Sequence, residues 1–403
     1  MEVTDLTLEK VYQAAHVLKP VARKTSVIRA VNIAPDCELY LKAENLQVTG
    51  AFKVRGAYYK MSMLTEEEKA RGVVACSAGN HAQGVALAAK ENGIKSTIFV
   101  PSAAPISKIE AARSYGSEIR LVNGVYDDAY NAAIEYLEES NAVFVHPFED
   151  VDVIAGQGTI GLEILEQLPE VEAIIAPVGG GGLISGIAYA VKKLKPSCKI
   201  YGVQAAGAGS MSKSFEENEL TTLNRVLTFA DGIAVKSPGK MTFSLCAEYV
   251  DEIVTVTDDE IATAILTLME KQKLVTEGAG AVSVAAVMFG KLPIAGKKCV
   301  SIVSGGNIDV NILSRVINRG LTTTGRLTEL TIEMRDMPGQ LSTVSGIVSD
   351  LGANVVKVRH DPAGENSDIN SCVLHLSMET KNLDHLQEIK KAMANAGYKI
   401  LKD

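Results

Sequence analysis

Residues 50–57 read Gly-Ala-Phe-Lys-Val-Arg-Gly-Ala and place a lysine beside an aromatic residue at the expected start of a helix. Partial burial between Phe52 and Val54 would lower the pKa of the Lys53 amine towards the neutral, nucleophilic form. A Schiff-base lysine needs that form. On these eight residues alone a solvated surface lysine is the simpler interpretation, because most charged side chains are exposed. The rest of the chain decides between the two.

Strands and helices alternate after this stretch. Expected strands are Val73–Cys76, Ser96–Val100, Glu118–Val122 and Val143–His146, and expected helices are Ala82–Asn92, Ile106–Tyr115 and Asp127–Ser140. The alternation continues with a helix from Gly158, a strand at Ala173–Pro177, a helix from Ile184 and strands at Lys199–Gln204 and Lys298–Val303, while residues 205–232 have no clear assignment. This order predicts parallel sheets with flanking helices, in which ligands bind at the carboxyl ends of the strands.

Length and composition describe an ordinary globular protein. The 403 residues predict two or three domains, and 47% hydrophobic residues with a net charge of −8 give no attraction to nucleic acid or to an anionic membrane. The six cysteines are scattered without zinc-ligand spacing, so we expect reduced thiols, and no metal site. The N-terminal residues lack a signal-peptide pattern, and no apolar run reaches about 18 residues, so we expect a cytoplasmic protein.

Four consecutive glycines, Gly179–Gly182, lie between an expected strand and an expected helix. Their amides, together with the positive end of the helix, favour an anion such as phosphate. The run lacks the Gly-Lys-Ser/Thr of nucleoside triphosphate loops, and Ile184 occupies the last glycine position of a dinucleotide fingerprint. A flexible turn without a ligand is the alternative interpretation.

Two more polar turns contain glycine. Ser77-Ala78-Gly79-Asn80-His81 follows one strand, and Ser304-Gly305-Gly306-Asn307 follows another. For the first turn taken alone, a helix cap is the favoured interpretation. Three such turns at sheet ends with one candidate Schiff-base lysine predict a site for a phosphorylated aromatic aldehyde.

The organisation changes near the C-terminus. Residues 315–327 indicate a linker, and residues 328–403 follow the order βαββαβ, which is typical of a ferredoxin-like unit. The turn after its first strand reads Asp336-Met337-Pro338-Gly339-Gln340-Leu341.

These motifs, in this order, resemble those of the threonine and serine dehydratases among the fold type II pyridoxal-phosphate enzymes. The resemblance covers about residues 1–320 and implies a catalytic domain at 1–314, with a smaller subdomain at about 50–150. The C-terminal unit resembles an ACT domain, an amino-acid-sensing module, as in single-ACT threonine ammonia-lyases.

The resemblance assigns a role to each motif. It implies that Lys53 forms the Schiff base with pyridoxal phosphate, Phe52 packs beside the cofactor, Asn80 bonds the ring hydroxyl, and Ser304 meets the pyridine nitrogen. It further implies that Gly179, Gly180, Gly181, Gly182 and Leu183 hold the phosphate, and that Ser77, Ala78, Gly79, Asn80 and His81 bind the substrate. His81 as a catalytic group has turn stabilisation as its alternative, and Glu277 at the ring edge stays an open possibility.

The implied reaction converts L-threonine to 2-oxobutanoate and ammonia, and L-serine to pyruvate. The resemblance implies that Lys53 is the base that removes the Cα proton and that an amino acid is the effector of the ACT unit. The expected assembly is a homodimer or a homotetramer. Alternatives are a main activity on L-serine, a β-replacement synthase, and a sensor that binds without turnover.

Two departures limit the resemblance. Ala78 stands where related serine racemases carry a serine base, so racemisation is not expected. Residues 205–208, Ala-Ala-Gly-Ala, lack the carboxylates of the cation site in those enzymes, so we expect no metal there.

Overall fold

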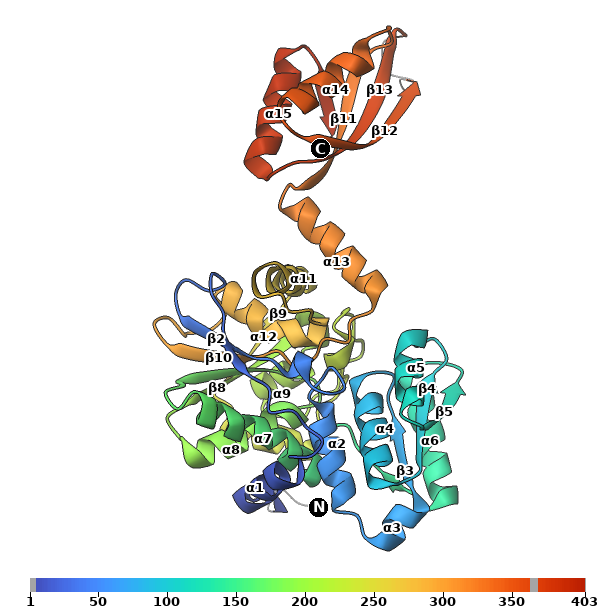
Figure 1. Cartoon of the computed structure of the whole chain (residues 1–403), viewed down its shortest axis with the longest axis vertical. Coiled ribbons are helices and arrows are strands. Elements are labelled where there is room, and N and C mark those ends of the chain that lie inside the picture. The colour runs from blue at the N-terminus through green and yellow to red at the C-terminus, as the bar shows by residue number, and fades with distance from the viewer. Residues whose placement is uncertain (1–4, 363–368, 403) are drawn as a thin grey trace. The chain divides into compact units, whose positions relative to one another are not determined.

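The computed structural model describes residues 5–362 and 369–402. The chain divides into two compact units, residues 1–310 and 311–403 (Figure 1). The first unit is α/β with two mainly parallel sheets, and the second has one small antiparallel sheet. The predicted fold class is confirmed. Across the described residues, none of the helices has the length and apolar composition needed to cross a membrane.

The smaller subdomain is built on a parallel sheet in the order β5-β4-β3-β6. Its strands are β3 (Val73–Cys76), β4 (Ser96–Pro101), β5 (Glu118–Val122) and β6 (Val143–Phe144). Its helices are α2 (Lys53–Ser62), α3 (Glu66–Arg71), α4 (Asn80–Asn92), α5 (Ile106–Ser114) and α6 (Tyr126–Ser140).

Alternation along these strands covers both faces of the sheet. Val73 and Ala75 pack against α2, α4 and α5, whereas Val74 and Cys76 pack against α6. Successive side chains of a strand point to opposite faces, so a run of apolar residues fills two cores at once.

The larger sheet has the order β1-β2-β10-β7-β8-β9, parallel except for β1 at its edge. Its strands are β1 (Val27–Arg29), β2 (Glu38–Lys42), β7 (Ala173–Pro177), β8 (Lys199–Ala205), β9 (Glu252–Val256) and β10 (Lys298–Ile302). The helices of this part are α1 (Leu8–Val17), α7 (Val151–Gln167), α8 (Gly182–Leu194), α9 (Ser210–Glu217), α10 (Lys240–Tyr249), α11 (Asp258–Thr267) and α12 (Gly278–Met288).

Helix α8, which begins at the glycine run, is fixed by close packing against α7. A Cβ on Gly186 would overlap the carbonyl oxygen of Ile154, and one on Gly158 would lie 2.9 Å from the carbonyl oxygen of Gly186. The two backbones therefore approach more closely than larger residues would allow. This contact holds the start of α8 rigidly at the carboxyl end of β7.

Several boundaries differ from the sequence predictions. Helix α7 begins at Val151, not Gly158, because Asp150 caps it by accepting from the amides of Asp152 and Val153. Helix α4 begins at Asn80, so His81 lies in its first turn. The unassigned stretch contains α9, and α10, β1 and β9 were not predicted from the sequence.

The second unit has the order β11 (Leu327–Arg335), α14 (Gln340–Asp350), β12 (Asn354–Pro362), β13 (Ser371–Glu379), α15 (Leu383–Asn395), β14 (Lys399–Lys402). The strand order β12-β13-β11-β14 is the expected ferredoxin-like arrangement. Buried residues of β11 and β13, such as Ile332 and Leu374, face Val344 of α14 and Ile389 of α15.

The predicted linker is largely helical. Helix α13 (Val310–Thr323) covers most of residues 315–327, and the division between the units falls after Val310 rather than after residue 314. Leu313, Val316 and Gly320 recur at helical spacing, and the last two are buried. This periodicity favours a helix over an irregular connection.

Candidate active site

The lysine stretch lies directly against the Ser304 turn. The backbone amide of Phe52 donates to the carbonyl oxygen of Ser304 at 3.1 Å, and Ala51 forms an isolated antiparallel bridge with Gly305. Helix α2 then begins at Lys53. Two of the predicted motifs, far apart in the sequence, are therefore joined backbone to backbone.

The Lys53 amine points into this region. Its Nζ donates to the carbonyl oxygen of Pro147 at 2.7 Å and lies 5.2 Å from the centre of the Phe52 ring. Burial lowers the pKa of Lys53 to about 8, against the opposing effect of Glu277. A larger fraction of this amine is therefore neutral near neutral pH than for an ordinary exposed lysine, which favours a nucleophilic role.

Pro147 and Phe148 link the lysine to the glycine run. Pro147 accepts the hydrogen bond from Lys53, and Phe148 packs closely against the glycine run. A Cβ on Gly180 would overlap the Phe148 ring, and a Cβ on Gly182 would lie 2.9 Å from the Cα of Phe148. No sequence motif pointed to this pair, although it follows β6 at the carboxyl end of the smaller sheet.

The glycine run forms the start of α8. Gly181 has φ of +99°, a conformation that favours glycine, and it precedes the helix without a side-chain cap. The first amides of a helix have no acceptor within the helix, so this uncapped end favours an anion. Thr242 Oγ1 fixes the loop from outside by donating to the carbonyl oxygen of Gly180 at 2.6 Å.

Asn80 belongs to a polar cluster in which Glu277 is buried and Asn80 and Asn307 are half-buried. Its Nδ2 donates to Glu277 Oε1 at 2.5 Å, and its Oδ1 accepts from Asn307 Nδ2 at 2.8 Å. Burial, with a smaller effect of Asp231, raises the pKa of Glu277 to about 7. Within the described residues, Glu277 Oε2 is buried without a hydrogen-bond partner, which marks an unsatisfied acceptor inside the site.

The Ser77–His81 turn leads into α4. The amide of Gly79 donates to Ser77 Oγ at 3.2 Å, and α4 begins at Asn80 without a side-chain cap. His81 Nε2 donates to the carbonyl oxygen of Val145 at 2.7 Å, and burial lowers its pKa to about 3. The His81 ring is thus neutral and committed to the backbone, which favours turn stabilisation over proton transfer.

Ser304 completes the group. Its hydroxyl is 3% exposed and donates to the carbonyl oxygen of Ala279 at 3.3 Å. Gly232 and Ile233 link Glu277 to the glycine run. A Cβ on Gly232 would lie 3.4 Å from Glu277 Oε1, and Ile233 packs against Gly179. The predicted turns and the lysine are therefore neighbours of one region between the two subdomains.

Two family profiles match the chain. The profile described as "Pyridoxal-phosphate dependent enzyme" matches residues 18–305, and that of the ACT domain matches residues 328–395. The chain belongs to the pyridoxal-phosphate dependent enzymes. It carries an ACT domain at its C-terminal end.

Relatives match over most of the chain. The L-threonine ammonia-lyase of Thermotoga maritima is 49% identical over 98% of this chain and 99% of its own. The processed form of threonine deaminase isoform 2 from Solanum lycopersicum has a TM-score of 0.73 at 38% identity, covering 77% of this chain and 93% of its own. Maize serine racemase has a TM-score of 0.73 at 34% identity, and the match covers 78% of this chain and 98% of the racemase chain. The resemblance inferred from the motifs is confirmed.

The residues present fit the family's cofactor, pyridoxal phosphate. The uncapped, glycine-built start of α8 suits a phosphate, and the Lys53 amine suits an aldehyde. The buried Ser304 hydroxyl and the Asn80 amide offer polar contacts for a heteroaromatic ring. The groups that this family's cofactor needs therefore lie together in the candidate site of this enzyme.

Proposed function

We propose that this enzyme is an L-threonine ammonia-lyase that converts L-threonine to 2-oxobutanoate and ammonia. The observation that carries the proposal is the position of the Lys53 amine. It donates to the carbonyl oxygen of Pro147, next to Phe148, which packs against the glycine loop, and burial lowers the pKa of Lys53. The name of the Thermotoga maritima relative, at 49% identity over nearly the whole chain, supports threonine as the substrate.

In this proposal Lys53 would hold the cofactor aldehyde through Nζ, and Gly179–Leu183 would hold the phosphate at the start of α8. Phe52 would pack beside the ring, Asn80 would donate to the ring hydroxyl, and Ser304 would meet the ring nitrogen. When bound, pyridoxal phosphate supplies an electron sink for the charge that develops at Cα as a proton leaves. A neutral hydroxyl at the ring nitrogen keeps that sink weaker than a carboxylate would, which favours prompt elimination.

The substrate carboxylate binds at the start of α4, where uncapped backbone amides and the Ser77 hydroxyl are available. Asn80 lies in the same turn and helps orient both ligands. Ala78 offers no proton acceptor, so only one face of Cα has a base, and elimination without racemisation is the expected outcome.

Lys53 acts a second time as the general base. Its neutral Nζ removes the Cα proton, the bond from Cβ to the hydroxyl oxygen breaks, and the hydroxyl takes up one proton and leaves as water, so that the proton removed and the proton taken up balance. Hydrolysis of the released product consumes one water. The net change is one L-threonine to one 2-oxobutanoate and one ammonia, and L-serine gives pyruvate and ammonia in the same way.

The ACT domain carries the proposed regulation. An amino-acid effector binding there would change the rate, and pairing of ACT sheets between subunits fits a homodimer or homotetramer.

The test measures kcat/KM for L-threonine and L-serine with the cofactor-loaded protein, identifying the 2-oxo acid and quantifying ammonia. We expect equimolar 2-oxobutanoate and ammonia, with L-threonine preferred. Pyruvate from L-serine as the faster reaction would make it a serine ammonia-lyase instead. Cofactor spectral change without either product would overturn the lyase assignment and favour a synthase or a sensor.

A further inference from the structure

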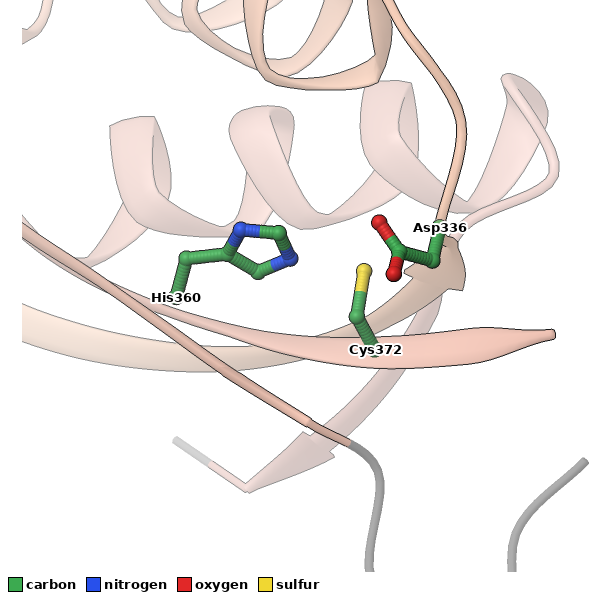
Figure 2. A group of neighbouring side chains, drawn as sticks. All are labelled: Asp336, His360 and Cys372. Atoms are coloured by element: carbon green, nitrogen blue, oxygen red, sulfur yellow. The ribbon is translucent and has the colours of Figure 1, made fainter. Parts of the chain in front are cut away.

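Three potential metal ligands lie together in the ACT domain, far apart in the sequence. Asp336 follows the end of β11, His360 lies near the end of β12, and Cys372 lies near the start of β13. The spacing of these residues along the chain matches no zinc motif, which is why no metal site was expected from the sequence. Figure 2 shows their side chains turned towards one another.

The strand register explains the gathering. Met334 pairs with Cys372 across β11 and β13, and His360 pairs with Leu374 across β12 and β13. Directly opposed residues share a face, as do residues two apart on one strand, so His360 and Cys372 share a face. Asp336, two positions beyond Met334, continues the same face. Antiparallel pairing thus brings all three to one end of the sheet.

The donor atoms are close and accessible. One donor atom from each of the three side chains lies within 4.8 Å of the other two. Asp336 and His360 are exposed, whereas Cys372 is buried, with only 1% of its surface exposed. In the described part of the chain, the His360 ring and the Asp336 carboxylate have no hydrogen-bond or ion-pair partner, whereas the Cys372 thiol donates to the Met334 carbonyl oxygen at 3.6 Å. Two of the three donors are therefore available without breaking a contact.

We propose that Asp336, His360 and Cys372 form a divalent-metal site that takes Zn²⁺, with water as the fourth ligand. A thiolate with an imidazole and a carboxylate is a donor set that suits Zn²⁺ and excludes Mg²⁺ and Ca²⁺, which take oxygen ligands. A thiolate and a carboxylate together neutralise the ion, so no uncompensated charge is left at the edge of the ACT core. Three protein ligands leave the fourth position open.

The proximity of the donor atoms is compatible with zinc coordination. Zinc bonds of about 2.0–2.3 Å place tetrahedral ligand atoms roughly 3.3–3.8 Å apart, which lies inside the limit of 4.8 Å that holds for these atoms. Rotation of the exposed Asp336 and His360 side chains can supply any adjustment, while Cys372 is held in the core. The ion would tie the ends of β11, β12 and β13 together beside the turn that leads into α14.

The test uses the full-length, cofactor-loaded protein after metal removal by a chelator. Co²⁺ is titrated as a probe while the cobalt–thiolate charge-transfer absorbance is followed by difference spectroscopy, and Zn²⁺ affinity is obtained by displacement. The variants are Cys372→Ser, His360→Gln and Asp336→Asn. His375→Gln is the matched control, because His375 lies on β13 on the opposite face, bonded to Thr331.

We expect one Co²⁺ per chain with a charge-transfer band that Cys372→Ser abolishes. His360→Gln and Asp336→Asn should weaken Zn²⁺ binding by at least about tenfold, the loss known even for residues that only orient metal ligands. His375→Gln should bind as the wild type does. A wild-type protein without the band, or the same loss of affinity in His375→Gln as in His360→Gln, would overturn the proposal. Both His variants change surface-accessible side chains, so the comparison does not depend on the core substitution folding.

Discussion

The side-chain amide of Asn80 donates to the carboxylate of Glu277 at 2.5 Å, which joins the first residue of α4 to the residue before α12. The smaller subdomain is thereby tied to the larger one inside the candidate site. Lys108 and Asp231 form a second link, an ion pair between α5 and the loop before α10. Glu277 is also the negative group that opposes the effect of burial on Lys53.

Replacing Glu277 by Gln should lower the pKa of Lys53 below about 8. Glu277 raises that pKa, and an uncharged amide of the same shape removes the effect. The apoenzyme then has a neutral Lys53 at lower pH, so the rate at which it captures pyridoxal phosphate should reach half its maximum at a lower pH. Following the visible absorbance of bound cofactor over a pH series measures this shift. Glu166→Gln, on the surface, is the control, and an unchanged or higher midpoint in Glu277→Gln would contradict the assigned electrostatics.

Replacing Lys53 by Ala should lower turnover of L-threonine by at least about 10²-fold, because a general base contributes about 10²–10⁴. Thermal unfolding should change little, since the amine makes one hydrogen bond to a backbone carbonyl. Release of 2-oxobutanoate is the measurement, with Lys69→Ala as a surface control. Turnover within tenfold of the wild type would remove Lys53 from the proposed mechanism.

Replacing Gly180 by Ala should weaken cofactor binding by at least about tenfold, since a Cβ at this position overlaps the Phe148 ring and displaces the loop. Equilibrium titration of the apoenzyme with pyridoxal phosphate measures the change. Gly346→Ala is the control, because Gly346 has open space around its Cβ position on α14. Wild-type affinity in Gly180→Ala would show that the loop does not hold the phosphate.

The convergence of the polar turns was predictable from the sequence. Each turn follows a strand of a predicted parallel sheet, and carboxyl ends of parallel strands meet at one edge. The start of α7 could not be predicted from the sequence, because Gly156, Gly158 and Gly161 weaken the helical pattern. Only the packing of α7 against α2 and α8 shows why glycine is needed at these positions. The contact of Phe148 with the glycine loop and the proposed metal ligands Asp336, His360 and Cys372 were also not predicted. Both depend on tertiary contacts between residues far apart in the sequence.

Arg55, two residues after Lys53, is a structural residue that the motif alone did not explain. Its buried guanidinium donates to Glu44 Oε1 at 2.8 Å and to Glu163 Oε1 at 2.6 Å. Arg55→Met should destabilise the fold by about 3–5 kcal/mol, because it leaves the buried Glu44 charge without its partner. Denaturant unfolding measures the loss. Arg113→Met, which breaks an exposed pair with Glu110, should cost about 1 kcal/mol or less.

The same pair predicts acid sensitivity. Burial raises the pKa of Glu44, but Arg55 outweighs this effect and holds that pKa below its usual range. The stability that the pair contributes is therefore present above the unfolded-state pKa of a glutamate and is lost as pH falls through the folded-state pKa. The wild type should lose more stability than Arg55→Met between neutral and acidic pH. An equal loss in both proteins would contradict the role of this pair.

Removing residues 328–403 should abolish any effect of added amino acids on the rate while leaving turnover of L-threonine. The matched domain occupies this segment, and the candidate active site lies wholly within residues 1–310. Initial rates with isoleucine, valine, serine or threonine added, compared between the full and shortened chains, give the answer. An effector response that survives the truncation would place the sensor in the catalytic unit.

The most direct test of the account is chemical trapping of the cofactor on the enzyme. The loaded protein is reduced with borohydride and digested, and the modified peptide is identified by mass spectrometry. The account predicts that the cofactor is attached to Lys53, in the peptide that contains Phe52 and Val54. Attachment to any other lysine, or no attachment at all, would contradict it.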